Sequence, residues 1–119
     1  MPDKTVILYG IPNCDTMKKT RKWLDANSVD YVFHDYKKLG IDKTLAKRFI
    51  AEVPLETLIN KRGTTWRKLP SAQQESLDTT TAVDIICNNP SIVRRPLIQN
   101  GSQWLAAYDE TQLRTLLAK

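Results

Sequence analysis

The stretch Thr5-Val-Ile-Leu-Tyr-Gly-Ile-Pro-Asn-Cys14 decides the fold of this chain. Thr5–Tyr9 is a short run rich in β-branched and aromatic residues, and Gly10 and Pro12 close it. Such a run between chain breakers predicts a buried strand. Cys14 therefore stands where the chain leaves a strand.

A helix and a second strand follow this stretch. Apolar residues at helical spacing predict a helix at about Asp15–Ala26, which Asn13 can cap. Asp30–Tyr36 alternates around its aromatic residues and predicts the second strand. A strand–helix–strand unit implies a parallel pair of strands with a right-handed crossover.

The middle of the chain is predicted to be helical. Asp42 caps a helix that reaches about Glu52, and Pro54 opens another that runs to about Asn60 and that Gly63 ends. We expect Arg62–Leu69 to be polar and irregular. Thr79 or Thr80 can cap a further helix that reaches Asn88, with an apolar stripe of Val83, Ile86 and Cys87.

The last part of the chain predicts a β-hairpin and a final helix. Pro96–Gln99 and Ser102–Ala107 flank Asn100-Gly101, which fits a two-residue type I′ turn because both residues tolerate positive φ. Asp109 can cap a closing helix whose inward residues are Leu113, Leu116 and Leu117.

The order of these elements defines the expected architecture. A β-α-β half, a helical insert and a β-β-α half give one α/β domain over residues 1–119. We expect a mixed four-stranded sheet flanked by helices, which is the thioredoxin-like fold with an inserted helical subdomain at about 41–90.

Composition excludes several classes of protein. The chain has 119 residues, 41% of them hydrophobic, which suits one globular domain and argues against disorder. Its two cysteines are too few for a disulfide scaffold, and its single histidine excludes a metal site of several histidines. No apolar run reaches the roughly 18 residues of a membrane span, and the N-terminus lacks signal-peptide features. We therefore expect a cytoplasmic protein, with its thiols reduced and no membrane partner.

The net charge of +5 favours anionic partners such as glutathione, oxyanions or acidic protein surfaces. Arg62–Lys68 mixes cations with Trp66 and could form a nucleic-acid surface, but a packed tryptophan under a surface loop explains it better. Nucleic acid is therefore not the expected partner. His34 ends the second strand, and we interpret it as a hydrogen-bonded structural residue.

Cys14 is the candidate nucleophile, because free N–H groups and the helix dipole at a helix start stabilise a thiolate. A free thiol has a pKa of about 8.5, so a mostly ionised thiol at neutral pH needs about 2.7 kcal/mol. A helix terminus supplies roughly 0.3 to 2 kcal/mol, and a cation at about 4 Å adds up to about 4 kcal/mol. The candidate cations are Lys18, Arg94 and Arg95. The alternative is a small buried cysteine at a strand–helix junction.

Cys87 and Met17 decide how a mixed disulfide on Cys14 could be resolved. Cys87 shares an apolar stripe, so we expect it to be buried and inert, although it could serve as a resolving thiol. Met17 leaves no second cysteine three residues after Cys14, which excludes a local disulfide. The other possible resolving thiol is an external one, such as that of glutathione.

Arg95-Pro96 opens the hairpin, and by itself it suits a basic surface loop. In a thioredoxin fold the proline at this place is cis and faces the active thiol, and an X-Pro bond adopts cis at little cost. Arg95 would then lie beside Cys14, with its backbone able to pair with an extended peptide such as glutathione.

The chain resembles the ArsC/Spx family of arsenate reductase-like thioredoxin-fold proteins, and within it the YffB-like group of glutathione-dependent thiol reductases. The resemblance covers nearly the whole chain, and four segments carry it: Leu8–Thr16, His34–Tyr36, Arg62–Leu69 and Arg95–Leu97. It implies a helical subdomain inserted in a thioredoxin core. It also implies Cys14 as the nucleophile and Arg95-Pro96 as its partner segment.

The chain departs from the arsenate reductases at four positions. Gly10 stands where they carry histidine, Met17 where they carry serine, and Asn60 and Ala107 where they carry arginine. Of the three oxyanion-binding arginines only Arg95 remains, and a tetrahedral anion needs several donors at once. Met17 also removes the Cys-x-x-Cys pair of the Spx regulators.

The sequence therefore predicts a glutathione-dependent thiol–disulfide reductase with Cys14 as its single nucleophile and Arg95 as the stabiliser of the thiolate. Lys18 is a weaker candidate for that second role. The expected substrate-binding residues are Asn13, Lys18, Arg94, Arg95 and Pro96. We expect a monomer with no bound cofactor or metal, glutathione as co-substrate, and a small-molecule or protein disulfide as substrate. The alternatives are an Spx-like module that binds RNA polymerase without chemistry, and an arsenate reductase.

Overall fold

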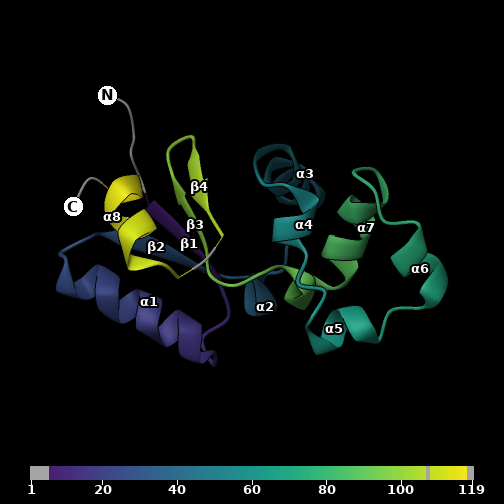
Figure 1. Ribbon diagram of the computed structural model, residues 1–119, viewed down its shortest axis with the longest axis horizontal. Helices are drawn as coiled ribbons and strands as arrows, with labels where there is room; N and C mark the ends of the chain where they lie inside the picture. Colours follow the sequence, from purple (N-terminus) through teal and green to yellow (C-terminus); the bar gives the residue numbers. More distant parts are fainter. Residues whose placement is uncertain (1–5, 107, 118–119) are drawn as a thin grey trace. The chain divides into compact units, whose positions relative to one another are not determined.

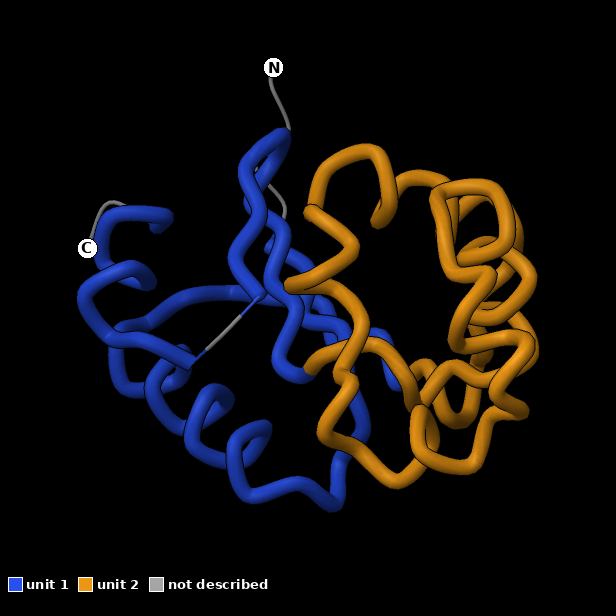
Figure 2. The backbone as a smooth tube through the Cα atoms, turned by 45° about the vertical axis from the view of Figure 1, so that its right-hand side comes forward, with its two compact units in different colours: residues 1–35, 95–119 blue, residues 36–94 orange. Residues whose placement is uncertain are grey.

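The computed structural model describes residues 6–106 and 108–117 (Figure 1). The chain divides into two compact units (Figure 2). The first unit combines the residues up to Asp35 with those from Arg95 onward, and the second unit spans Tyr36–Arg94. The chain therefore enters the second unit after the second strand and leaves it before the third.

The first unit holds a mixed four-stranded sheet in the order β2-β1-β3-β4. β1 pairs with β2 in parallel and with β3 antiparallel, and β3 and β4 form an antiparallel hairpin. This arrangement confirms the predicted α/β sheet of the thioredoxin-like fold, with a helical insertion between its halves. The strands are β1 (Val6–Gly10), β2 (Tyr31–Asp35), β3 (Leu97–Asn100) and β4 (Gln103–Leu105).

Two helices of the first unit share one apolar cluster with the sheet. They are α1 (Asp15–Ala26) and α8 (Glu110–Leu117); α1 has the predicted bounds, and α8 begins directly after Asp109, its predicted cap. The buried members of the cluster come from β1, β3, α1 and α8, so both helices cover the same face of the sheet. These members are Val6, Leu8, Met17, Trp23, Leu24, Ile98 and Leu113.

The second unit is helical, and α3 packs against α7. Asp42 caps α3 as predicted, because its carboxylate accepts the N–H of Leu45 at 2.8 Å. Phe49 is fully buried, and the hydroxyl of Tyr36 donates to the carbonyl of Val93 at 2.8 Å. The elements are α2 (Tyr36–Leu39), α3 (Lys43–Glu52), α4 (Leu55–Leu58), α5 (Thr64–Arg67), α6 (Ser71–Glu75), α7 (Thr81–Asn88) and the 3₁₀ helix η1 (Pro90–Ile92).

Several predicted bounds from the second strand to Leu69 were wrong. The second strand ends at Asp35, because fully buried Tyr36 begins α2 instead. The helix after Pro54 stops at Leu58, and Gly63 is the N-cap of α5 rather than the end of a helix. Arg62–Leu69, expected to be irregular, contains that helical turn. α5 and α6 are too short to show a helical period, so tertiary packing rather than propensity stabilises them.

The start and the buried face of α7 also differ from the prediction. Thr80 is the N-cap but makes no side-chain cap bond, and the carboxylate of Asp78 accepts the N–H groups of Thr80 and Thr81 at 2.8 Å each. The fully buried residues of α7 are Ala82, Ile85 and Ile86. Val83 and Cys87, predicted to lie on the apolar stripe, are only half-buried. The buried face is therefore rotated from the predicted one.

The hairpin turn lies one residue later than predicted. Asn100 belongs to β3 and pairs with Gln103, so the turn residues are Gly101 and Ser102. A type I′ turn needs positive φ at both central residues, whereas of these two only Gly101 has it, at 62°. Glycine at the first central position fits a type II′ turn. The side-chain amide of Asn100 donates to the carbonyl of Leu116 at 2.8 Å, which favours this register.

The ends of the final segment agree with the prediction in part. Asp109 caps α8, because its carboxylate accepts the N–H of Gln112 at 3.0 Å. Leu113 is fully buried, while Leu116 and Leu117 pack against the cluster as partly buried residues. Ala107, the last residue of the predicted second hairpin strand, lies outside the described residues. No helix within the described ranges is long and apolar enough to cross a membrane.

Candidate functional site

Cys14 is the N-cap residue of α1. Its backbone is extended, with φ −133° and ψ 130°, and its carbonyl accepts the N–H of Lys18 at 3.0 Å. The prediction that Asn13 caps this helix was wrong, because α1 begins at Asp15 as predicted and Cys14, directly before it, is the N-cap, while the Asn13 side chain is exposed. The N-cap place puts the Cys14 side chain where a serine or aspartate oxygen would normally accept backbone N–H groups.

The N–H groups of the first helical turn act on the Cys14 sulfur. Burial by itself raises the pKa of Cys14, and this is the largest single effect. The backbone N–H of Met17, the side chain of Arg95 and the backbone N–H of Thr16 act in the opposite direction, and together they lower the pKa below its ordinary value. The Cys14 side chain makes no cap hydrogen bond to the first turn of α1.

Arg95 supplies the charged part of this environment. Its side chain hydrogen-bonds to the sulfur of Cys14, and its positive charge adds a smaller Coulombic attraction. The Arg95–Pro96 peptide bond is cis, as expected, and Pro96 is buried at the start of β3. The fold therefore brings Cys14 and Arg95 together from positions that are far apart in the sequence.

Lys18 and Arg94 have other surroundings. The exposed Lys18 side chain is not among the groups that shift the pKa of Cys14, so Arg95 rather than Lys18 stabilises the thiolate. Arg94 belongs to the second unit, where its backbone N–H donates to the carbonyl of Leu58 at 2.8 Å. Its Nε donates to the carbonyl of Thr57 at 2.6 Å.

Cys87 is half-buried in the second unit rather than fully buried as expected. Burial and then the carboxylate of Asp84 raise the pKa of Cys87, with Asp42 acting in the same direction and Lys43 against it. Because of the raised pKa, a smaller fraction of Cys87 than of Cys14 is ionised at neutral pH, and Cys87 is the less nucleophilic of the two thiols. The two cysteines of the chain are thus shifted in opposite directions.

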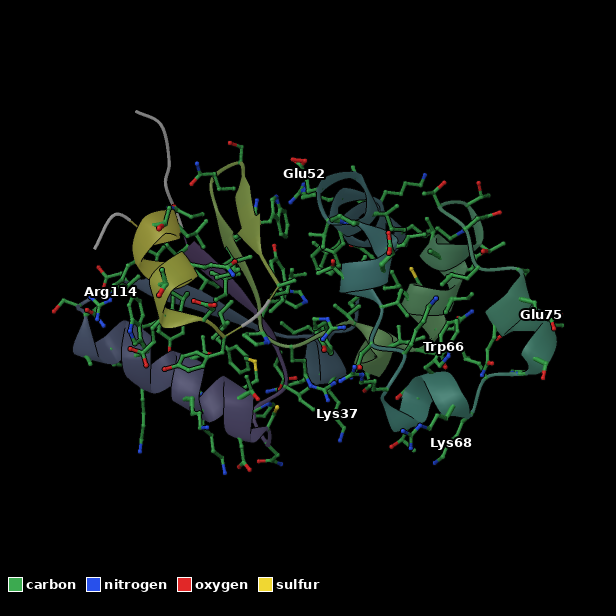
Figure 3. All side chains as sticks on the ribbon, viewed as in Figure 1. Lys37, Glu52, Trp66, Lys68, Glu75 and Arg114 are labelled. Carbon is green, nitrogen blue, oxygen red and sulfur yellow. The ribbon has the colours of Figure 1, made fainter. Side chains whose placement is uncertain are left out.

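The histidine and the basic loop lie in ordinary packing environments. The ring of His34 contacts the ring of Tyr9, with 5.4 Å between centroids. Lys61 Nζ lies 5.3 Å from the ring centroid of Trp66, a cation–π contact that occupies one face of the indole. Figure 3 shows Trp66 and Lys68 on the α5 segment of the second unit. Over the described residues, no group of three or more His, Cys, Asp or Glu side chains could hold a metal ion.

Sequence reasoning predicted that free N–H groups at the helix start would stabilise the Cys14 thiolate, but it did not name Thr16 and Met17 as the residues that supply them. Both lie in the first turn of α1, and their N–H groups lower the pKa of Cys14. The signal was available, because the second and third residues after an N-cap are the ones whose N–H groups the cap side chain accepts. Placing the cap at Asn13 instead of Cys14 concealed it.

The comparisons agree with this fold. The model of the ArsC family matches residues 9–116, which is nearly the whole chain. The chain belongs to the ArsC family. An uncharacterized protein of Haemophilus influenzae is 35% identical over 113 residues, which is 95% of this chain and 99% of that protein. The global transcriptional regulator Spx of Streptococcus pyogenes is 28% identical over 116 residues, or 96% of this chain and 86% of the regulator.

Solved structures give the same assignment. A structure named the YFFB protein is 42% identical and covers 95% of this chain and 99% of its own, with a TM-score of 0.90. The solution structure of an arsenate reductase (ArsC) related protein from Brucella melitensis is 40% identical, covers 97% of this chain and 96% of its own, and has a TM-score of 0.74. This ArsC-family protein is thus related to arsenate reductases, which confirms the resemblance found in the sequence.

Proposed function

We propose that this ArsC-family protein is a thiol–disulfide reductase that works through Cys14 alone and uses glutathione as its resolving thiol. The Cys14 thiolate attacks the glutathione sulfur of a glutathionylated substrate, so a Cys14–glutathione disulfide forms and the substrate leaves as a thiolate that takes a proton from water. A glutathione thiolate then attacks the glutathione sulfur of this mixed disulfide. Glutathione disulfide leaves and the Cys14 thiolate returns.

One observation carries the proposal: three groups around Cys14 favour its thiolate. They are the N–H groups of Thr16 and Met17 and the side chain of Arg95, and together they lower the pKa of the thiol despite its burial. A lowered pKa raises the thiolate fraction at neutral pH, and the thiolate is the nucleophile in disulfide exchange.

Two features of the chain favour an external resolving thiol. Position 17 holds a buried methionine, so the first turn of α1 offers no second sulfhydryl. Cys87 has a raised pKa, which disfavours it as the attacking thiolate. Glutathione carries two carboxylates, which suits the cationic side chains of Lys18 and Arg95 in the first unit, with Asn13 and Pro96 as further contacts.

The similarity to proteins named as Spx regulators supports an alternative function for this chain, which is a partner-binding module without chemistry. Such a module would need no activated thiol, so its Cys14 would ionise near an ordinary pKa of about 8.5. Arsenate reduction is the third possibility, since the family includes arsenate reductases.

The testing experiment follows alkylation of Cys14 against pH in a Cys87→Ser variant, with and without glutathione. We expect a midpoint well below about 8.5 and slower alkylation when glutathione is bound. Turnover of a glutathionylated peptide with glutathione should then disappear in Cys14→Ser and persist largely in Cys87→Ser.

Three outcomes would overturn parts of the proposal. A midpoint near 8.5 without protection would favour the partner-binding module. Equal loss of turnover in Cys14→Ser and Cys87→Ser would indicate an intramolecular disulfide. Faster turnover of arsenate than of the glutathionylated peptide would make the chain an arsenate reductase.

A further inference from the structure

Gly10 and Met17 are complementary in shape. Gly10 is buried at the end of β1, and a Cβ placed on it would overlap Sδ of Met17 and lie 2.5 Å from its Cε. The backbone does not require glycine here, because among the described glycines only Gly40 and Gly101 have positive φ. The missing side chain therefore leaves space for the thioether of Met17.

Met17 anchors the first turn of α1. Of Asp15, Thr16, Met17 and Lys18, only Met17 is fully buried, with none of its surface exposed. It packs in the apolar cluster against which Cys14 also lies. A methionine side chain is flexible and fills irregular spaces, so its position depends on the cavity that receives it.

The anchored residue is also the third residue after the N-cap Cys14, a position whose N–H points toward the side chain of the cap residue. The N–H of Met17 gives the largest of the favourable effects on the Cys14 anion, ahead of the Arg95 side chain. A hydrogen bond to an anion depends on donor distance and angle, and a displaced first turn would weaken it. The fit between the Met17 side chain and Gly10 thus bears on the geometry at Cys14.

We propose that Met17 is a positioning residue for the Cys14 nucleophile, and that its side chain, seated in the space above Gly10, holds its own backbone N–H toward the sulfur. This inference rests on the proposed function, in which Cys14 reacts as a thiolate. It adds a role for a buried apolar side chain that touches no substrate.

The test measures the ultraviolet absorbance of the Cys14 thiolate against pH in a Cys87→Ser background. Met17→Ala, which removes the anchor, and Gly10→Ala, which displaces it, should each raise the midpoint by about half a pH unit or more. Below the midpoint this corresponds to about threefold less thiolate. Met17→Leu conserves volume and should keep the midpoint of the parent protein.

Leu113→Ala is the matched control, because Leu113 is a fully buried member of the same cluster on α8. It should lower the thermal midpoint of unfolding and leave the ionisation of Cys14 unchanged. The inference is overturned if Met17→Ala leaves the ionisation midpoint in place, or if Leu113→Ala raises it equally. If Gly10→Ala does not fold, the comparison of Met17→Ala with Met17→Leu decides.

The readout separates this inference from the proposed function. A parent protein whose thiol ionises near about 8.5 would refute the proposed function itself. A parent protein with a low midpoint that Met17→Ala does not change would refute only the positioning role of Met17.

Discussion

Replacing Arg95 by alanine should raise the pKa of Cys14, because the Arg95 side chain donates to the sulfur and attracts its negative charge. A hydrogen bond that involves a charged group contributes about 1.5–3 kcal/mol. Cys14 is only partly buried, so solvent screening reduces this to about 1.4 kcal/mol. That free energy corresponds to a shift of about one pKa unit.

The assay is the pH dependence of iodoacetamide alkylation in a Cys87→Ser background. The midpoint should rise by about one unit in Arg95→Ala. The nucleophilicity of a thiolate rises with its pKa, with a Brønsted slope of about 0.4–0.5, so the alkaline plateau should rise about threefold. Well below both midpoints the net alkylation rate should therefore fall only about three- to fourfold, because the loss of thiolate exceeds the gain in reactivity.

Arg94→Ala is the matched control, since it removes an adjacent arginine whose Nε donates to the carbonyl of Thr57. Its midpoint should equal that of the parent protein. Arg95→Lys keeps the charge but loses the guanidinium fork, so its midpoint should lie between those of the parent and Arg95→Ala. The reasoning fails if Arg95→Ala leaves the midpoint in place, or if Arg94→Ala shifts it by the same amount.

Three further predictions concern stability. The lowered pKa of Cys14 stabilises the folded state by its full amount above the unfolded thiol pKa of about 8.5, and not at all below the folded pKa. The unfolding free energy of the parent minus that of Cys14→Ser, measured in denaturant titrations, should therefore increase with pH between these two limits. A difference that does not change with pH would contradict the lowered pKa. Asp42→Ala removes the cap bond to the N–H of Leu45 and should cost about 0.5–2 kcal/mol of unfolding free energy in urea, whereas Asp42→Asn should retain most of it. Gly101→Ala places a side chain at a φ of 62° and should cost about 1–2 kcal/mol by the same measurement, although no atom lies within 4 Å of the added Cβ; an unchanged midpoint would mean that the turn can adopt another conformation.

The main elements of the first unit could be predicted because their signals are local. β1, α1 and α8 have clear hydrophobic periods or chain breakers, and Asp109 marks the start of α8 as an acidic cap. The short helices α5 and α6 have only four and five residues, which is too few for a period to be visible. Packing within the second unit stabilises them, and a single sequence does not report that packing.

Errors of a single residue had larger consequences at the site than in the fold. Moving the cap from Asn13 to Cys14 leaves the bounds of α1 as predicted, yet it makes the cysteine itself the N-cap residue of the helix. Likewise, Gly101 was expected to share its turn with Asn100, and the pairing of β3 with β4 moved the turn by one position. Local propensity tolerates both alternatives, and the tertiary contacts choose between them.

The sequence by itself determined the order of the elements, the place of Cys14 between a strand and a helix, and the absence of a second cysteine at position 17. These properties depend on neighbouring residues, and the spacing of hydrophobic residues and the residue types are enough to predict them. Only the tertiary structure decided that Arg95 rather than Lys18 acts on the sulfur, and that Met17 fills the space above Gly10. Both depend on side-chain contacts that form when the pairing of β1 with β3 and the packing of α1 bring separate segments together, and no local pattern encodes such distances.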